Sequence, residues 1–230
     1  MPNLTSKLER LPEAMGETPI DLFIVCASFE SRSTLIAMHL NRAQILRCAV
    51  AYNADFREYA IGNAEKVRDK FDSSEIVELN TNEPIITADR LAHIVSSQFS
   101  GGAKRILVDI TAFTRESLLM LLRVISTHVR NADEINFVYT TAAEYSVGAK
   151  GRDKWLSKGI NEIRSVVGYP GNILPTRNTH LIVLVGFEDE RALELIQDCE
   201  PTVVSLGLGD DRVAATSPHQ ETNVERLLRI

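Results

Sequence analysis

The chain has 230 residues, a net charge of −6 at pH 7 and a hydrophobic fraction of 44%. A chain of this length and composition folds, and it suits one large domain or one and a half of ordinary size. The acidic charge argues against duplex nucleic acid as the main partner, because that partner requires a broad basic surface. The acidic net charge does not exclude a small anionic ligand, because a single pocket can be positive on an acidic protein.

The longest apolar runs, at residues 21–28 and 180–187, are too short to span a bilayer. The N-terminal segment lacks the apolar core of a signal peptide. Cys26, Cys48 and Cys199 form no CxxC pair, and two of them lie in apolar runs typical of strands. These features predict a cytoplasmic protein that contacts no membrane and keeps its thiols buried and reduced.

Strand and helix patterns alternate along the first part of the chain. Short runs rich in Val, Ile, Leu and aromatic residues predict strands, and a helical pattern follows each of the first four. The strands are expected at 21–27, 45–52, 75–80, 105–111 and 134–141, and the helices at 32–40, 55–71, 87–99 and 115–129. This alternation predicts an α/β fold, a Rossmann-like, doubly wound and mainly parallel sheet with the strand order 3-2-1-4-5.

The segment from residue 142 to residue 177 interrupts this alternation. It contains several glycines and a cluster of basic residues, Lys150, Arg152, Lys154 and Lys158. Glycine allows loop conformations that other residues resist. We therefore predict a mobile basic loop, a short strand at 163–167 and then a linker.

The strand–helix pattern restarts near residue 180. A strand is expected at 180–186, a helix at 188–198, a second strand at 202–208 and the start of a helix at 224–230. The end of the first of these strands, with Phe187 and Glu188, repeats the Phe29 and Glu30 that follow the first strand of the chain. Two copies do not establish a repeat, so this similarity indicates either two related halves or a coincidence of common residues.

The predicted organisation has four parts. They are a lead-in segment at 1–18, a Rossmann-like ligand-binding domain at 19–150, a basic loop and linker at 151–178 and a second, partial α/β unit at 179–230. The last helical pattern has no terminating signal. We expect the second unit either to be truncated where the sequence ends or to close with a natural C-terminal helix.

Polar residues follow the two strands that this order places at the centre of the sheet. In a doubly wound sheet, ligands bind beyond the carboxyl ends of the strands, at the point where the strand order reverses. Here that point lies between the first and the fourth strands. The candidate ligand-binding residues are Ser28, Glu30, Arg32, Ser33, Asp109, Thr111, Thr114 and Arg115.

These residues suit an anion site, and they also have structural explanations. Hydroxyls and backbone N–H groups at the start of a helix bind anions, and an arginine adds positive charge. The serines and Thr114 can equally cap helices, and Glu30 with Arg32 can form an ordinary surface pair. Asp109 ends an apolar strand and requires partners, because an unpaired buried charge is costly.

The segment at 109–116, between an apolar strand and an apolar helix, resembles the signature of CRISPR-associated Rossmann-fold (CARF) sensor domains. That signature has Asp or Asn, an apolar residue, Thr, two glycines, Thr and Lys. The chain matches it at Asp109, Thr111 and Thr114. Arg115 replaces the Lys, and Ala112 and Phe113 replace the glycines. Because the glycines let a ligand phosphate approach the backbone, we expect Phe113 to crowd that approach.

The resemblance implies a homodimer in bacterial antiviral defence that binds a cyclic oligoadenylate in a groove between its subunits. It also implies an effector domain or partner protein, and some members slowly cleave their ligand. The helix expected at 115–129 supports a dimer independently, because it is apolar almost all round and should bury more than one face. The alternative is a central helix covered by the second unit.

Three functions are the resulting hypotheses. The first is a sensor that binds a small anionic nucleotide, a second messenger resembling a cyclic oligonucleotide. The second is a nucleotide- or nucleoside-processing hydrolase with Glu30, Asp109 or Glu144 as the acid or base. The third is an assembly subunit of a defence complex, with the apolar helix and the basic loop as contact surfaces. No P-loop, dinucleotide fingerprint or metal-ligand spacing occurs, so neither a cofactor nor a metal is expected.

Overall fold

The computed structural model describes residues 18–54, 57–72, 75–99, 105–128, 134–141, 160, 162–171, 176–185, 189–208 and 223–228. The chain divides into two compact units. Unit 1 comprises Met1–Thr141 and Val166–Pro170, and unit 2 comprises Ala142–Ser165 and Gly171–Ile230. The boundary between Thr141 and Ala142 coincides with the point at which the alternation of strand and helix patterns stops in the sequence.

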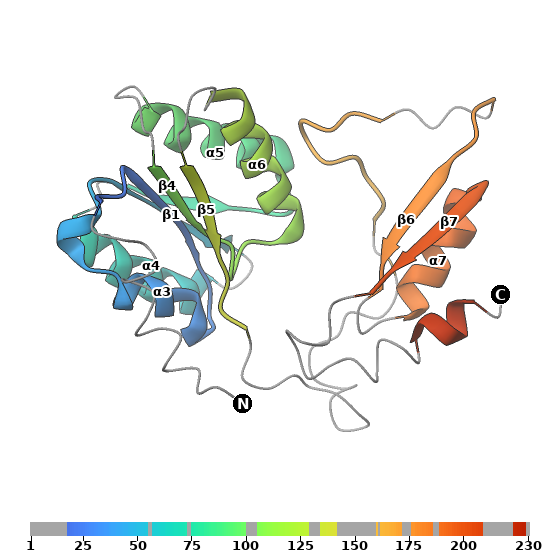
Figure 1. Ribbon diagram of the computed structural model, residues 1–230, viewed down its shortest axis with the longest axis horizontal. Coiled ribbons are helices and arrows are strands. Elements are labelled where there is room, and N and C mark those ends of the chain that lie inside the picture. Colours follow the sequence, from blue (N-terminus) through green and yellow to red (C-terminus); the bar gives the residue numbers. More distant parts are fainter. Residues whose placement is uncertain are drawn as a thin grey trace. The chain divides into compact units, whose positions relative to one another are not determined.

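Unit 1 is built on a five-stranded parallel sheet with the order β3-β2-β1-β4-β5 (Figure 1). The strands are β1 (Leu22–Ala27), β2 (Cys48–Asn53), β3 (Ile76–Leu79), β4 (Arg105–Asp109) and β5 (Glu134–Val138). The predicted Rossmann-like α/β fold and the predicted strand order are both confirmed. The strand order reverses between β1 and β4, where Val25 is in register with Asp109.

Helices cover both faces of this sheet, as right-handed crossovers between parallel strands require. On one face lie α5 (Pro84–Phe99) and α6 (Arg115–His128), and on the other lie α3 (Leu35–His39) and α4 (Arg57–Phe71) (Figure 1). Two 3-10 helices complete the unit: η1 (Ser31–Thr34) leads into α3, and η2 (Arg42–Gln44) precedes β2.

The central strand β1 divides its side chains between the two faces. Leu22, Ile24 and Cys26 pack with α5 and α6, and Phe23, Val25 and Ala27 pack with α3 and α4. Successive residues of a strand point to opposite faces, so a strand covered on both sides is a continuous apolar run. The apolar run of the sequence therefore identified the strand at the centre of the sheet.

Two predicted boundaries shift for local reasons. The helix expected from residue 87 begins earlier, at Pro84, because a proline at the first helical position loses no hydrogen bond within the helix. The strand expected from residue 45 begins later, at Cys48, because Ile45, directly after η2, forms only an isolated parallel bridge with Ile20. The side chain of Asn41 accepts a hydrogen bond from the N–H of Ala43 at 3.0 Å and so caps η2.

The short strand predicted at 163–167 is wrong. Residues 162–166 form no strand, and a turn follows in which the N–H of Tyr169 donates to the carbonyl of Val166 at 2.9 Å. Val166 and Val167 instead pack against the core beneath α5 and α6. Short apolar runs do not distinguish strand pairing from core contact, and here the run marks a core contact.

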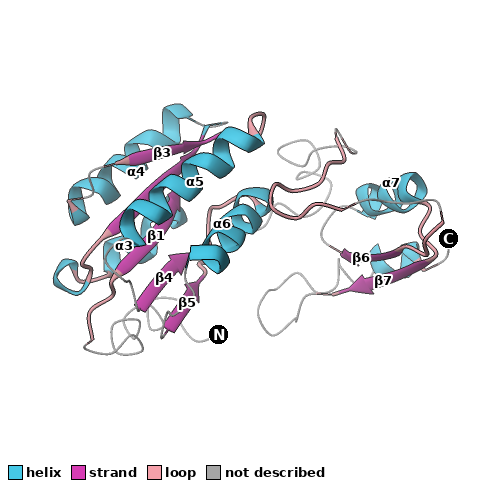
Figure 2. Cartoon of the chain, turned by 90° about the horizontal axis from the view of Figure 1, so that it is seen from above, coloured by secondary structure: helices cyan, strands magenta, loops and turns pink. Residues whose placement is uncertain are grey.

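Unit 2 contains a two-stranded parallel sheet, β6 (His180–Leu184) and β7 (Val203–Gly207), connected through α7 (Asp189–Cys199). Figure 2 shows α7 over one face of the two strands. Val183 and Leu206 meet Ala192 of α7 there, together with Leu227 of a helical turn at 223–227. The predicted second α/β unit is therefore present.

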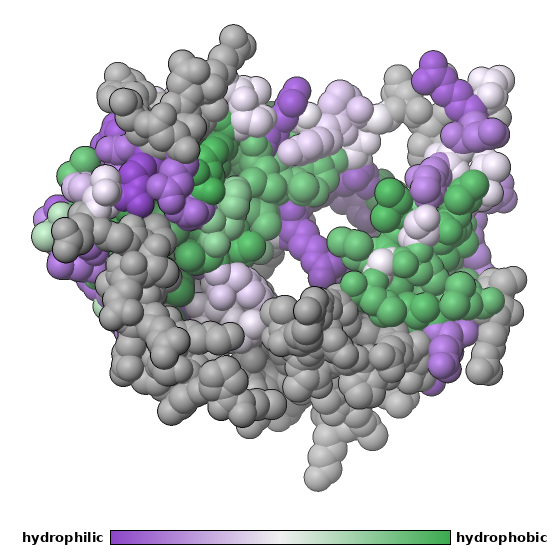
Figure 3. Space-filling view, in the orientation of Figure 1, coloured by the Kyte–Doolittle hydropathy of each residue, from purple (hydrophilic) through white to green (hydrophobic). Residues whose placement is uncertain are grey.

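The other face of β6 and β7 is apolar and exposed (Figure 3). Ile182 is 66% exposed, Leu184 75% and Val203 51%. Sheets of parallel strands usually have both faces covered, but the described residues of unit 2 leave one face of its sheet without a cover.

Among the described residues, no helix has both the length and the apolar character needed to cross a membrane.

Candidate functional site

The carboxyl ends of β1 and β4 lie side by side, because the two strands pair in parallel. Residues 28–30 connect β1 to η1, and residues 110–114 connect β4 to α6. The predicted ligand-binding residues lie on or next to these two connections. The structure therefore brings them to one edge of the sheet, at the point where the strand order reverses.

Ser28 in the first connection and Ser33 in η1 stabilise the loop between β1 and η1. The hydroxyl of Ser33 accepts from the N–H of Ser28 at 3.1 Å and donates to the carbonyl of Glu30 at 2.7 Å. The hydroxyl of Ser28 accepts from the N–H of Glu30 at 3.3 Å. Both serines are buried, and no side chain caps η1. Their hydroxyls therefore shape a tight loop in front of η1.

Arg32 connects this loop to the end of β5. Its Nε donates to the carboxylate of Glu30 at 2.7 Å, and an Nη donates to the carbonyl of Thr140 at 2.9 Å. A longer contact of 3.4 Å joins the same Nη to the hydroxyl of Tyr139, over whose ring the guanidinium lies. Because β4 lies between β1 and β5, the side chain of Arg32 reaches across the end of β4.

Asp109 is buried at the end of β4, with 1% of its surface exposed. Its Oδ1 accepts from the N–H of Thr111 at 3.0 Å, whereas its Oδ2 has no hydrogen-bond partner among the described residues. Burial raises the pKa of Asp109 to about 6, although hydrogen bonds from Thr111 and the charge of Arg32 act in the opposite direction. The charge of this carboxyl therefore changes close to neutral pH.

Thr111 and Thr140 are also buried and polar. We call Asp109, Thr111 and Thr140 the buried polar cluster. The Oγ1 of Thr111 accepts from the N–H of Thr140 at 2.9 Å. The Oγ1 of Thr140 is buried and, within the described part of the chain, has no partner. Buried polar atoms are nearly always paired with protein or water. The cluster therefore has two positions for hydrogen bonds that the described chain does not supply.

Thr114 caps the N-terminus of α6. Its Oγ1 accepts from the N–H of Ser117 at 3.1 Å and lies 2.8 Å from the Ser117 hydroxyl. Arg115 follows it and is exposed. Phe113 is buried in the core beneath α5 and α6. Its ring therefore packs into the core.

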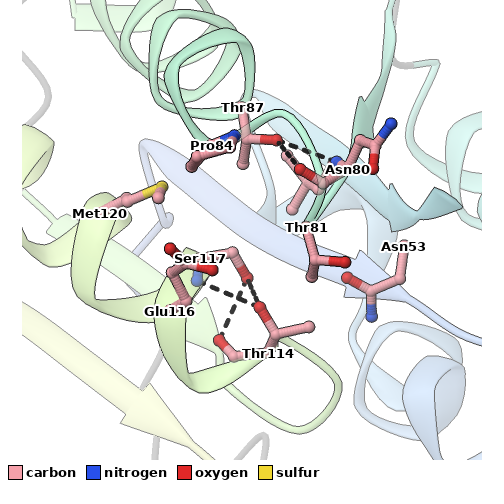
Figure 4. Close-up of a pocket in the computed structure, with 10 residues that line it drawn as sticks. Asn53, Asn80, Thr81, Pro84, Thr87, Thr114, Glu116, Ser117 and Met120 are labelled. Carbon is pink, nitrogen blue, oxygen red and sulfur yellow. Dashed lines mark hydrogen bonds between the residues drawn. The ribbon is translucent and has the colours of Figure 1, made fainter. Parts of the chain in front are cut away.

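A pocket beside these loops contains residues that the sequence prediction missed. It lies at the carboxyl ends of β2 and β3, between the first turns of α5 and α6 (Figure 4). The residues that line it are Asn53, Leu79, Asn80, Thr81, Pro84, Thr87, Thr114, Glu116, Ser117 and Met120. Only Thr114 was predicted as a site residue. The position of Asn53 and Asn80 at the ends of predicted strands could have indicated this pocket. Polar residues at strand ends are also common in turns, however, so this signal is not specific.

The predicted catalytic carboxylates differ in their surroundings. Glu144 lies outside the described residues. Glu30 forms an ion pair with Arg32 at 2.7 Å, and Asp109 is closed off from solvent. In this conformation Asp109 therefore touches no substrate. Within the part of the chain that the structure describes, no group of three or more His, Cys, Asp or Glu residues is suited to hold a metal ion.

The fold and the polar edge define a Rossmann-like α/β domain with a candidate ligand site at its switch point. No model of a known protein family matches the chain, and a search among curated proteins finds no match. The resemblance to CARF domains therefore rests on residues 109–116 and on the arrangement of the sheet.

Proposed function

We propose that unit 1 binds a small anionic nucleotide where β1 and β4 end, and that the protein is a sensor of a nucleotide second messenger. The observation that carries this proposal is the buried polar cluster. Asp109 Oδ2 and Thr140 Oγ1 are buried without a partner among the described residues, at the carboxyl ends of neighbouring strands. Doubly wound sheets bind nucleotides at this edge, and a water held beneath a bound ligand can supply the missing hydrogen bonds.

The charges along the edge suit an anion. The N-terminus of a helix favours negative charge through its dipole and N–H groups, and the exposed Arg115 adds a cation at the first position of α6. Arg32 offers a second guanidinium, whose bonds to Glu30 and Thr140 can be exchanged for bonds to a phosphate. Such an exchange would release the end of β5 from the loop after β1. Binding then has a structural consequence, as a sensor requires.

Sensing accounts for these contacts better than hydrolysis does. A general acid or base must lie within hydrogen-bond reach of its substrate. Asp109 is buried and Glu30 is paired with Arg32. The resemblance to CARF domains supports the same choice. It suggests a cyclic oligoadenylate as the messenger, a homodimer as the binding state and antiviral signalling through an effector.

A thermal-shift panel tests the proposal. It contains cyclic oligoadenylates, cyclic dinucleotides, mononucleotides and NAD, and each compound is re-examined by chromatography after incubation. A ligand that binds only the folded state raises the melting temperature by mass action. We expect a shift with the ligand recovered intact. A consumed ligand would favour the hydrolase, and the absence of any shift or turnover would overturn both functions.

The placement of the site is tested with Arg115→Ala. Loss of a hydrogen bond to a charged group costs about 1.5–3 kcal/mol, so the affinity for the nucleotide should fall at least about tenfold. The matched control is Arg57→Ala, which removes the same charge from the first position of α4, on the opposite face of the sheet. Equal affinities of Arg115→Ala and the wild type would contradict a site at the start of α6.

A second candidate function, assembly, is favoured by the uncovered face of unit 2. His180 and Val203, Ile182 and Ser205, and Leu184 and Gly207 are paired along that face. These six residues include no Asp, Glu, Lys or Arg, so the same face of a second copy brings no like carboxylate or ammonium charge against them. We propose a second copy as its partner. Leu184→Glu should then convert a dimer into a monomer in analytical ultracentrifugation, and a wild type that is already monomeric would contradict the assembly.

A further inference from the structure

A groove lies along the outer edge of the sheet of unit 1, between β3 and α5. β3 is the last strand on this side of the sheet, and among the described residues no strand pairs with its other edge (Figure 2). The groove has a volume of about 260 Å³. The residues that line it are Glu75, Val77, Ile86, Asp89, Arg90 and His93. None of them belongs to the connections after β1 and β4, so the groove is separate from the candidate ligand site.

The groove has the direction and the length of a short extended chain. Its four helical residues recur at every third or fourth position of α5 and so form one stripe of that helix. Glu75 approaches His93 at 3.9 Å and Glu78 approaches Arg90 at 3.7 Å, which shows that α5 runs alongside β3. From residue 86 to residue 93 the helix rises roughly 10 Å, as much as about three residues of a strand.

The main chain of β3 is accessible to a hydrogen-bond donor at this edge. An Nη of Arg90 donates to the carbonyl of Glu78 at 2.8 Å. At the edge of a sheet, the N–H of a further strand can fill such a position. Here a long side chain that is 40% exposed occupies it, and this side chain can turn into solvent. The edge of β3 can therefore accept another strand when Arg90 moves away.

The groove combines an apolar floor with an acidic rim. Val77 and Ile86 contribute the apolar surface, and Glu75 and Asp89 contribute carboxylates. The guanidinium of Arg90 adds a positive charge, but the neighbouring carboxylate of Glu78 offsets it. A lysine or arginine side chain fits this combination, because its apolar stem can lie on the floor while its charged end stays at the carboxylates and in water.

We infer that this groove binds an extended peptide segment of a partner protein, which adds a strand to β3 and places a lysine or arginine side chain at Asp89. In strand addition, main-chain hydrogen bonds provide affinity and sites for alternate side chains provide specificity. The volume is below the roughly 300–1,000 Å³ of pockets that enclose a small ligand, and Ile86 and His93 at the rim are exposed. An open groove of this size suits single side chains of a peptide. This interaction goes beyond nucleotide binding and does not depend on it.

Fluorescence polarisation of the full chain with labelled hexapeptides tests the inference. The first peptide alternates lysine and valine, and the second has glutamate in place of lysine. We expect the lysine peptide to bind at least about fivefold more tightly, because it exchanges repulsion at the rim for attraction. Two further lysine peptides are N-methylated, one at the lysines and one at the valines. Only one of these sets of N–H groups can point toward β3, so one methylated peptide should bind at least about tenfold more weakly than the other.

Asp89→Lys tests the position of the basic side chain. It should weaken binding of the lysine peptide at least about fivefold. Asp69→Lys is the matched control, because it makes the same charge change at an exposed site of α4 and should change the affinity less than about twofold. Asp89→Asn should have a smaller effect in the same direction, and it replaces Asp89→Lys if that variant does not fold.

Four results would overturn the peptide groove, and nucleotide binding would stand after each of them. They are no binding of the lysine peptide at millimolar concentration, equal affinities of the lysine and glutamate peptides, equal affinities of the two methylated peptides, and equal effects of Asp89→Lys and Asp69→Lys. Spermidine serves as a competitor in the same assay. If it displaces the lysine peptide at an equal concentration, the groove binds small cations and the inference also fails.

Discussion

Arg32 and Thr140 are joined by a hydrogen bond of 2.9 Å from a guanidinium Nη to a main-chain carbonyl, although 108 positions separate them in the sequence. The first residue belongs to η1 and the second follows β5, and β4 lies between the strands that lead to them. The bond therefore ties together two connections that share no strand pairing. It closes the sheet edge at the candidate site, so its rupture should be measurable in both stability and binding.

We predict that Arg32→Ala lowers the free energy of unfolding by about 1–2 kcal/mol. Hydrogen bonds to charged groups contribute about 1.5–3 kcal/mol, and the side chain of Arg32 is 25% exposed, which places the loss toward the lower end. Urea denaturation measures the change. The control is Arg68→Ala, whose exposed pair with Asp69 should contribute less than about 0.5 kcal/mol. Equal losses in the two variants would contradict a structural role for the Arg32 bond.

Asp109 should make the stability of unit 1 depend on pH. Burial raises its pKa from 3.8 to about 6 on folding, so the folded chain binds the proton more tightly than the unfolded chain. The corresponding stabilisation is complete below about pH 4 and is lost as the pH rises through 6. Over that window it amounts to about 3 kcal/mol. The sign is opposite to that of an ordinary salt-bridged aspartate.

Asp109→Asn isolates this contribution, because the amide does not titrate. Between pH 4.5 and pH 7.5, the variant should gain about 2 kcal/mol relative to the wild type in urea denaturation. Asp69→Asn, at an exposed site on α4, is the control and should change little between the two values. A difference between Asp109→Asn and the wild type that is the same at both pH values would show that the carboxyl does not change its pKa on folding.

The sheet was predictable because parallel strands covered on both faces are continuous apolar runs. Residues 22–27 are such a run, and the right-handed crossovers then fix the strand order. The edge that carries the candidate site follows from that order. The contact of Arg32 with Thr140 does not, because it depends on where the loop after β5 runs.

The buried thiols lead to a third prediction. Cys26 and Cys48 are buried, as predicted, whereas Cys199 is half-buried. Burial raises the pKa of the Cys26 thiol, with the charge of Asp109 adding to the effect, and it raises the pKa of Cys48 to about 12. Because the thiolate is the reactive form, at pH 8 a disulfide reagent such as DTNB should modify Cys199 in the folded chain and all three thiols in urea.

Cys199→Ser is the matched variant for this titration. It should abolish the reaction of the folded chain and leave two thiols reactive in urea. Rapid modification of Cys26 or Cys48 without denaturant would mean that the sheet opens on the time scale of the reaction. Rapid modification of Cys26 would be the more informative of these two results. Cys26 packs beneath α5 and α6 next to the strand that carries Asp109, so its modification would report opening at the candidate site.

Two glycines of unit 1 should respond in opposite ways to alanine. Gly168 has φ of 89°, and a Cβ there would lie 2.8 Å from the side chain of Arg123. Gly62 lies within α4 and has nothing within 4 Å of the position that a Cβ would take. Gly168→Ala should therefore lower the free energy of unfolding by about 1–2 kcal/mol, and Gly62→Ala should raise it by about 0.5–1 kcal/mol.

Urea denaturation of the two variants checks this prediction. The result for Gly168→Ala also tests whether residues 166–170 contribute to the stability of unit 1. Gly168 lies in the turn that follows Val166 and Val167, the residues that return to the core beneath α5 and α6. If Gly168→Ala is as stable as the wild type, the packing of Val166 and Val167 against the core adds nothing to the stability of unit 1. The segment at 166–170 then does not belong to its cooperative fold. A loss of stability instead makes these residues part of unit 1, although the intervening chain separates them from its last strand.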